Sequence, residues 1–185
     1  MKRLLIVVDY QNDFVDGALG FEGAELLEEP ILEKIAAYRE AGDPIWFTFD
    51  THHPDYLDTQ EGRKLPVPHC LEGTPGWALY GKVADAQMDA DEVFLKPTFG
   101  SVDLCERLAK AQRVAMGLRT QPFESIELVG LVSSMCVLSN AVIARSACPD
   151  VPIIIDAACT AAPDPVMNEK ALDVLESLQI EVINR

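Results

Sequence analysis

Residues 4–14 read LLIVVDYQNDF, and this stretch decides the fold class. Its first five residues, Leu4 to Val8, are apolar without interruption, whereas a strand with one face in water alternates apolar and polar residues. We therefore predict a strand buried on both faces, as in a parallel sheet covered by helices. The apolar run ends at Asp9, so it is too short for a signal sequence or a membrane span.

Similar short apolar runs recur along the chain and alternate with segments of helical periodicity. The predicted strands are residues 4–8, 44–49, 93–95, 126–131, 153–155 and 180–183, and the predicted helices are residues 31–40, 102–110, 136–147 and 165–178. This alternation indicates an α/β fold with a parallel sheet and helices on both faces. We expect a single domain over residues 1–185, because the length suits one core and no linker or repeat interrupts it.

The composition excludes several classes of partner. The chain has 30 Asp and Glu residues against 15 Lys and Arg residues, a net charge of -15, and no basic cluster longer than a pair. It should therefore repel nucleic acid and anionic membrane surfaces. Its five cysteines include no CxxC pair, which favours reduced thiols and a cytoplasmic location. The sequence leaves open whether the chain forms a homo-oligomer.

Reactive side chains follow five of the six predicted strands. In strand order they are Asp9, then Asp50 with His52, then Lys96, then the turn Ser133-Ser134-Met135-Cys136, and then Asp156. Open parallel sheets bind ligands beyond the carboxyl ends of their strands. We therefore predict an active site along this edge of the sheet.

Three of these residues form a plausible nucleophile set. Cys136 lies where a strand gives way to a helix, and helix-terminal amides there should favour the reactive thiolate. Asp9 interrupts an apolar strand and would act as the base, with Lys96 as its balancing cation. Each residue alone is readily explained as a buried or salt-bridged structural group. Their joint placement at strand ends is what favours catalysis.

Residues 51–80 lack a periodic apolar pattern, and a loop of that length is usually functional. Asp50, His52 and the more distant His69 offer the carboxylate and imidazole ligands of a divalent transition metal such as zinc, iron or manganese. A structural zinc site would use more cysteine, and only Cys70 is near, so we expect an open site. His53 and Asp58 are also explained as solvated loop residues.

Five strings in this order resemble the motifs of the isochorismatase-like cysteine hydrolases, and within them the nicotinamidase branch: LLIVVDYQNDF, TFDTHH, LPVPHCLEGTPGW, LKPTFGS and GLVSSMCV. The resemblance implies a six-stranded, mainly parallel sheet in a three-layer α/β/α sandwich. It also implies a catalytic triad of Cys136, Asp9 and Lys96. It further implies a cis peptide between Leu131 and Val132 that aims the backbone amides of Val132 and Cys136 at an oxyanion.

The same resemblance implies a metal site and a substrate pocket. Asp50, His52 and His69 are the implied ligands, with Glu61 as our choice for a further ligand and Asp58 as the second choice. Phe14 resembles the aromatic residue that packs against a pyridine ring.

Two departures fall in this implied pocket. Ser133-Ser134 stands where the family usually has Thr-Asp, and no aromatic precedes His69 within residues 65–68. These departures concern the residues that would contact the substrate and leave the triad unchanged.

The activity implied by the resemblance is hydrolysis of nicotinamide to nicotinate and ammonia through a thioester, as in NAD salvage. Hydrolysis of another small amide, or of an N-carbamoyl or ureido compound, is the first alternative. Isochorismatase activity ranks lower because that branch needs no metal set. A non-catalytic ligand-binding module is the remaining alternative, although no triad member is missing.

Overall fold

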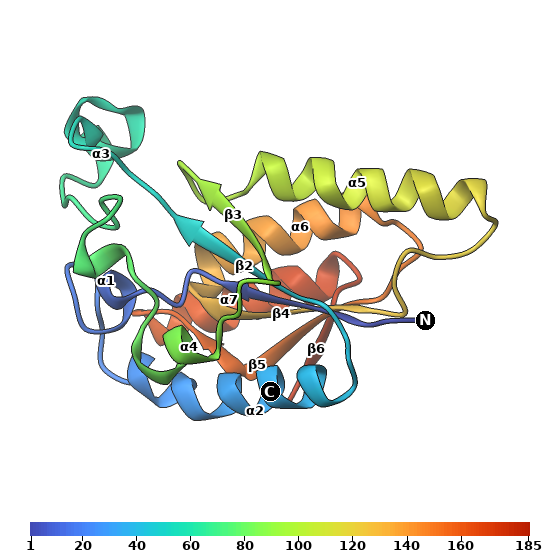
Figure 1. Ribbon diagram of the computed structural model, residues 1–185. Helices are drawn as coiled ribbons and strands as arrows, with labels where there is room; N and C mark the ends of the chain where they lie inside the picture. The colour runs from blue at the N-terminus through green and yellow to red at the C-terminus, as the bar shows by residue number, and fades with distance from the viewer.

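The computed structural model describes residues 1–185 and contains a six-stranded, all-parallel sheet in the order β3-β2-β1-β4-β5-β6 (Figure 1). The strands are β1 (Leu4–Val8), β2 (Ile45–Asp50), β3 (Glu92–Lys96), β4 (Ile126–Leu131), β5 (Ile153–Ala161) and β6 (Glu181–Ile183). Each predicted strand is present, and the parallel α/β fold predicted from the sequence is confirmed.

Helices cover both faces of this sheet, which gives the three-layer arrangement (Figure 1). One face is covered by α2 (Glu28–Glu40) and α4 (Gly81–Ala86), and the other by α5 (Val102–Gly117), α6 (Leu138–Ala147) and α7 (Pro165–Ser177). The four predicted helices are all present, and α5 runs two turns beyond its predicted end. None of the helices combines the length and the apolar character needed to cross a membrane.

Strand β1 lies in the middle of the sheet, and its side chains pack into the core on both faces. Leu4, Ile6 and Val8 pack into the apolar cluster under α5, α6 and α7. Leu5 and Val7 pack into the cluster under α2. Because all five side chains are fully buried, the uninterrupted apolar run has the two-faced burial that the sequence predicted.

The chain between β2 and β3 crosses the carboxyl ends of the strands, where Figure 1 places α1 (Asn12–Val15) and α3 (Gln60–Lys64). It contains only short elements: η2 (Tyr56–Asp58), α3 and η3 (Pro75–Trp77) precede α4. Two isolated bridges, Gln11 with Leu79 and His52 with Leu71, fasten it to the rest of the molecule. These elements, with α1 and η1 (Ala24–Leu27), were not predicted, because segments of three to six residues are too short to show a helical period.

The prediction that Asp156 lies at the active edge is wrong. Strand β5 continues to Ala161, so Asp156 is inside the strand rather than at its end. Its carboxylate accepts a hydrogen bond from Asn184 at 2.9 Å and pairs with Lys34 of α2 at 2.7 Å. The small and polar residues that follow it, AACTA, hid the continuation of the strand.

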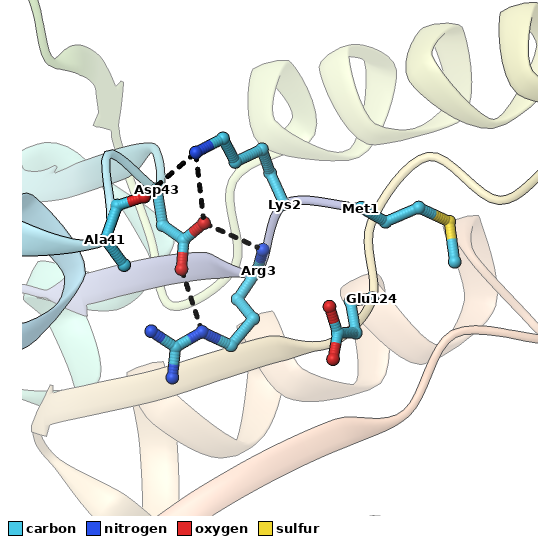
Figure 2. Close-up of a pocket in the computed structure, with 6 residues that line it drawn as sticks. All are labelled: Met1, Lys2, Arg3, Ala41, Asp43 and Glu124. Carbon is cyan, nitrogen blue, oxygen red and sulfur yellow. Dashed lines mark hydrogen bonds and ion pairs between the residues drawn. The ribbon is translucent and has the colours of Figure 1, made fainter.

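A shallow charged pocket of about 590 Å³ lies at the amino-terminal end of the sheet (Figure 2). The Nε of Arg3 donates to Asp43 at 2.8 Å, and the Nζ of Lys2 lies 3.9 Å from the same carboxylate. Both cations of this pocket are therefore already close to a carboxylate that offsets their charge.

We predict that Gly130→Ala destabilises the fold. Gly130 in β4 has φ of 109°, and an added Cβ would overlap the carbonyl oxygen of Val8 in the neighbouring strand. Strain and overlap together should lower the free energy of unfolding by about 2 kcal/mol or more, measured by equilibrium urea denaturation.

Gly117→Ala is the matched control. Gly117 ends α5, has no atom near its added Cβ and has an ordinary φ, so this variant should be neutral or gain up to about 1 kcal/mol. Equal unfolding midpoints for Gly130→Ala and the wild-type protein would contradict the proposed close contact between β1 and β4.

Candidate active site

Asp9, Lys96 and Cys136 meet at the carboxyl ends of β1, β3 and β4. The Nζ of Lys96 lies 2.6 Å from Oδ2 of Asp9 and 3.4 Å from Sγ of Cys136. Lys96 also donates to Oδ1 of Asp50 at 3.1 Å and to the carbonyl of Thr98 at 3.0 Å. The three residues that the sequence singled out as a nucleophile set are therefore brought into direct contact.

The backbone and β2 fix the orientation of Asp9. Asp9 has φ of 45°, a left-handed conformation that turns the chain sharply at the end of β1. Its amide donates to the carbonyl of Thr48, and the Thr48 hydroxyl donates back to Oδ1 of Asp9 at 2.7 Å. These two hydrogen bonds between Asp9 and Thr48 leave Oδ2 of Asp9 facing Lys96.

Cys136 lies in a wide helical turn rather than at the start of a regular helix. Residues Ser133–Val137 form a π-helical turn, in which the amide of Val137 donates to the carbonyl of Val132, and α6 begins only at Leu138. The predicted helix from residue 136 therefore starts two residues early. The peptide between Leu131 and Val132 is cis, as the resemblance implied.

Burial governs the charges in this cluster. It raises the pKa of Cys136 well above that of an ordinary thiol and raises the pKa of Asp9, although Lys96 opposes both shifts. Burial also disfavours a charged Lys96, but Asp9, Cys136 and Asp50 outweigh it and raise the pKa of Lys96. Burial therefore opposes the thiolate that helix-terminal amides were expected to favour, and the Lys96 ammonium is the group that favours it.

A second cluster adjoins the first. One ligand atom from each of four residues lies within 4.8 Å of the others, and the residues are Asp50, His52, Glu61 and His69. The Oδ2 atom of Asp50 is 3.0 Å from Nε2 of His52 and 3.2 Å from Nε2 of His69. Glu61 lies 3.7 Å from the same nitrogen of His52.

These donors fit a divalent transition metal. They comprise two imidazole nitrogens and two carboxylates, which is a set suited to zinc, iron or manganese. Nδ1 of His69 hydrogen-bonds the Val67 carbonyl at 2.8 Å, which leaves Nε2 facing the cluster. The first-choice residue Glu61 is in the cluster, whereas Asp58 and His53 are exposed and outside it.

Asp50 joins the two clusters. Its Oδ1 accepts from Lys96, while Oδ2 faces the two histidines. Burial favours the neutral acid, but His52, His69 and Lys96 hold the pKa of Asp50 far below its ordinary value. Asp50 is therefore a carboxylate even though it is almost completely buried.

A cavity of about 690 Å³ opens beside both clusters. Glu61 of the second cluster lines it, as do Pro97, which follows Lys96, and Met135, which precedes Cys136. Phe99 and Leu65 add apolar surface to its wall. Phe14 does not line this cavity: it is buried, and its ring lies 5.6 Å from that of His69.

Several residues of the site were not predicted. Tyr56 places its ring 4.5 Å from that of His52 and 5.0 Å from that of His69, so an aromatic from η2 packs beside the histidines although residues 65–68 supply none. Gln11 donates to the Asp50 carbonyl and accepts from the Asp50 amide. Thr48 and Asn140 are also buried at the site. For Thr48 and Asn140, the sequence signal that could have identified them is a polar residue inside an otherwise apolar strand or helix.

Comparisons with known proteins agree with this geometry. The chain is 30% identical over 153 residues to an uncharacterised isochorismatase family protein, PncA, of Bacillus subtilis, covering 77% of this chain and 78% of that protein. It is 29% identical over 147 residues to a nicotinamidase/pyrazinamidase of Mycobacterium tuberculosis, covering 75% of this chain and 76% of that protein. The solved structure of the nicotinamidase PncA from Bacillus subtilis superposes with a TM-score of 0.81 at 29% identity, covering 98% of this chain and 99% of that one.

The family assignment rests on nearly the whole length of the chain. The sequence profile described as the isochorismatase domain matches residues 3–185, which include every strand of the sheet and both clusters. The chain belongs to the isochorismatase family.

Proposed function

We propose that this protein is a metal-dependent cysteine amidohydrolase that converts nicotinamide to nicotinate and ammonia. The observation that carries the proposal is the contact of Asp9, Lys96 and Cys136 beside a four-residue metal-ligand cluster. A nucleophile, a base and a cation in mutual contact are the groups needed to form and hydrolyse an acyl-enzyme. The nicotinamidase named among its relatives supports this choice of substrate.

In the first half of the reaction, Asp9 takes the proton of Cys136 as Sγ attacks the amide carbon. Its raised pKa makes Asp9 a stronger base than an ordinary carboxylate, and it lies near the sulfur. The amides of Val132 and Cys136 stabilise the oxyanion of the tetrahedral intermediate. Asp9 then returns the proton to the departing nitrogen, the C–N bond breaks, and ammonia leaves a thioester on Cys136.

In the second half, Asp9 accepts a proton from a water molecule that attacks the thioester carbon. Collapse of this intermediate breaks the C–S bond, releases the carboxylic acid and returns the proton to Cys136. Lys96 stays protonated throughout, because Asp9 and Asp50 flank it. It stabilises the negative charge that moves between Cys136 and Asp9.

Asp50, His52, Glu61 and His69 would hold the metal. The ion that they hold would supply a Lewis acid able to bind the pyridine nitrogen and orient the substrate. Phe14 packs its ring against that of His69 and would therefore help to fix the orientation of this ligand.

The reduced state of the cysteines supports a cytoplasmic site of action. All five are free thiols, and only Cys105 is partly exposed. Reducing compartments preserve such thiols, including the one that the proposed reaction requires.

Hydrolysis of an N-carbamoyl or ureido compound is the second candidate. The cavity volume of about 690 Å³ lies in the range of small-molecule sites and does not restrict the substrate to nicotinamide. Assays that measure both ammonia and carbon dioxide separate the two, since only decarbamoylation releases both. Release of both from a carbamoyl substrate, at a rate above ammonia release from nicotinamide, would favour the second candidate.

We predict that Cys136→Ala abolishes ammonia release from nicotinamide. The variant lacks the nucleophile, so kcat should fall by at least about a thousandfold. A coupled ammonia assay measures this. Cys105→Ala, which removes a partly exposed thiol from α5, should retain wild-type activity. Equal rates for Cys136→Ala and the wild-type protein would eliminate the proposed nucleophile.

We also predict that Glu61→Gln weakens metal binding whereas Asp58→Asn does not. Glu61 lies in the ligand cluster and Asp58 lies outside it, so only the first change removes a ligand charge. The dissociation constant for zinc should rise at least about tenfold in Glu61→Gln, measured by competition with a chromophoric chelator. If Asp58→Asn weakened zinc binding as much as Glu61→Gln, the assignment of Glu61 as the fourth ligand would fail.

A further inference from the structure

We propose that Asn140 is a positioning residue. It holds residues 97–101, the segment that follows Lys96 (the Lys96 segment), against the turn that carries Cys136, and so sets the distance between the Lys96 ammonium and the Cys136 sulfur. The inference rests on the proposed function only in taking Cys136 as the nucleophile and Lys96 as its neighbouring cation. It holds for any amide substrate of this site.

Asn140 lies one helical turn after Cys136 and is completely buried. Its Nδ2 donates to the Cys136 carbonyl at 2.8 Å and to the Phe99 carbonyl at 3.0 Å. Its Oδ1 accepts from the Ser101 amide at 3.0 Å. One side chain thus satisfies backbone groups from two separate segments, and both of its amide hydrogens are used.

The segment from Pro97 to Ser101 determines where the Lys96 ammonium lies. Lys96 donates to the carbonyl of Thr98, which is inside this segment, as well as to Asp9 and Asp50. Asn140 supplies the hydrogen-bond partners of Phe99 and Ser101, the next residues along the same segment. Movement of this segment would therefore carry the Thr98 carbonyl away from Nζ of Lys96.

Asn140 thus acts as a clamp between two segments, and its second attachment is the backbone carbonyl of Cys136. The turn that carries Cys136 is a π-helical turn, whose wide spacing leaves its geometry less determined by regular helical hydrogen bonds. The bond from Asn140 to the Cys136 carbonyl therefore ties this turn to α6 and, through the same amide, to the Lys96 segment. The distance of 3.4 Å between Nζ of Lys96 and Sγ of Cys136 depends on both attachments.

Asn140→Ser tests this clamp. A serine hydroxyl can still bond the carbonyl four residues earlier, that of Cys136, but it is too short to reach Phe99 and Ser101. We expect kcat for ammonia release to fall roughly 10- to 100-fold, with KM changed less than about threefold, because positioning is lost while the binding groups remain. Asn140→Asp, which keeps the acceptor for Ser101 but loses both donors, should also lower kcat.

Ala144→Gly is the control for general destabilisation. Ala144 is a buried residue of α6 one turn further on, and glycine there weakens the helix without touching the Lys96 segment. The thermal midpoint of each variant is measured beside its kinetics. If kcat per folded molecule fell no further in the Asn140 variants than in Ala144→Gly, Asn140 would be a structural residue only and the proposal would be overturned.

A second measurement needs no substrate. Iodoacetamide labelling of Cys136, followed by peptide mass spectrometry with Cys105 as the internal reference thiol, should be slower in Asn140→Ser, because Lys96 no longer sits beside the sulfur. An unchanged or faster labelling ratio would count against the clamp. If wild-type protein released no ammonia from nicotinamide, the proposed function would fail, while this ratio would still decide the role of Asn140.

Discussion

The structure of the site depends on one buried ammonium group. The Lys96 side chain has no exposed surface, and an unpaired charge in that environment would be costly. Its partners come from separate parts of the chain: Asp9 after β1, Asp50 at the end of β2, and the Thr98 carbonyl in the following loop. The need to neutralise and hydrogen-bond this one group brings the strand ends together. The same requirement keeps Cys136 close to Asp9.

Asp50 extends this constraint to the second cluster. One of its oxygens accepts from Lys96 and the other faces His52 and His69, so the charge that stabilises the cation also faces the two histidines. Asp50 is therefore the carboxylate through which the second cluster contacts the cation beside Cys136. The large acid excess of the chain has little part in this arrangement, since Asp9 and Asp50 are its only completely or almost completely buried acids at the site.

The features that depend on local pattern were predictable from the sequence. Leu4 to Val8 predicted a strand buried on both faces, and reactive residues at strand ends identified Asp9, Lys96 and Cys136. Features that depend on long-range packing were not. The continuation of β5 past Asp156 relies on pairing with β4, and the roles of Thr48 and Asn140 rely on neighbours 39 to 41 residues away in the chain. The raised pKa of Cys136 was also missed, because a sequence pattern shows the turn but not the depth at which it is buried.

The central claim is that Cys136 carries the acyl group during turnover. Rapid acid quenching of the metal-loaded enzyme with saturating nicotinamide, followed by intact-mass and peptide mass spectrometry, tests it most directly. We predict a transient nicotinoyl adduct on the peptide containing Cys136, formed at least as fast as ammonia is released in steady state. An acyl group on a different side chain, or sustained ammonia release with no acyl-enzyme at any quench time, would contradict the account.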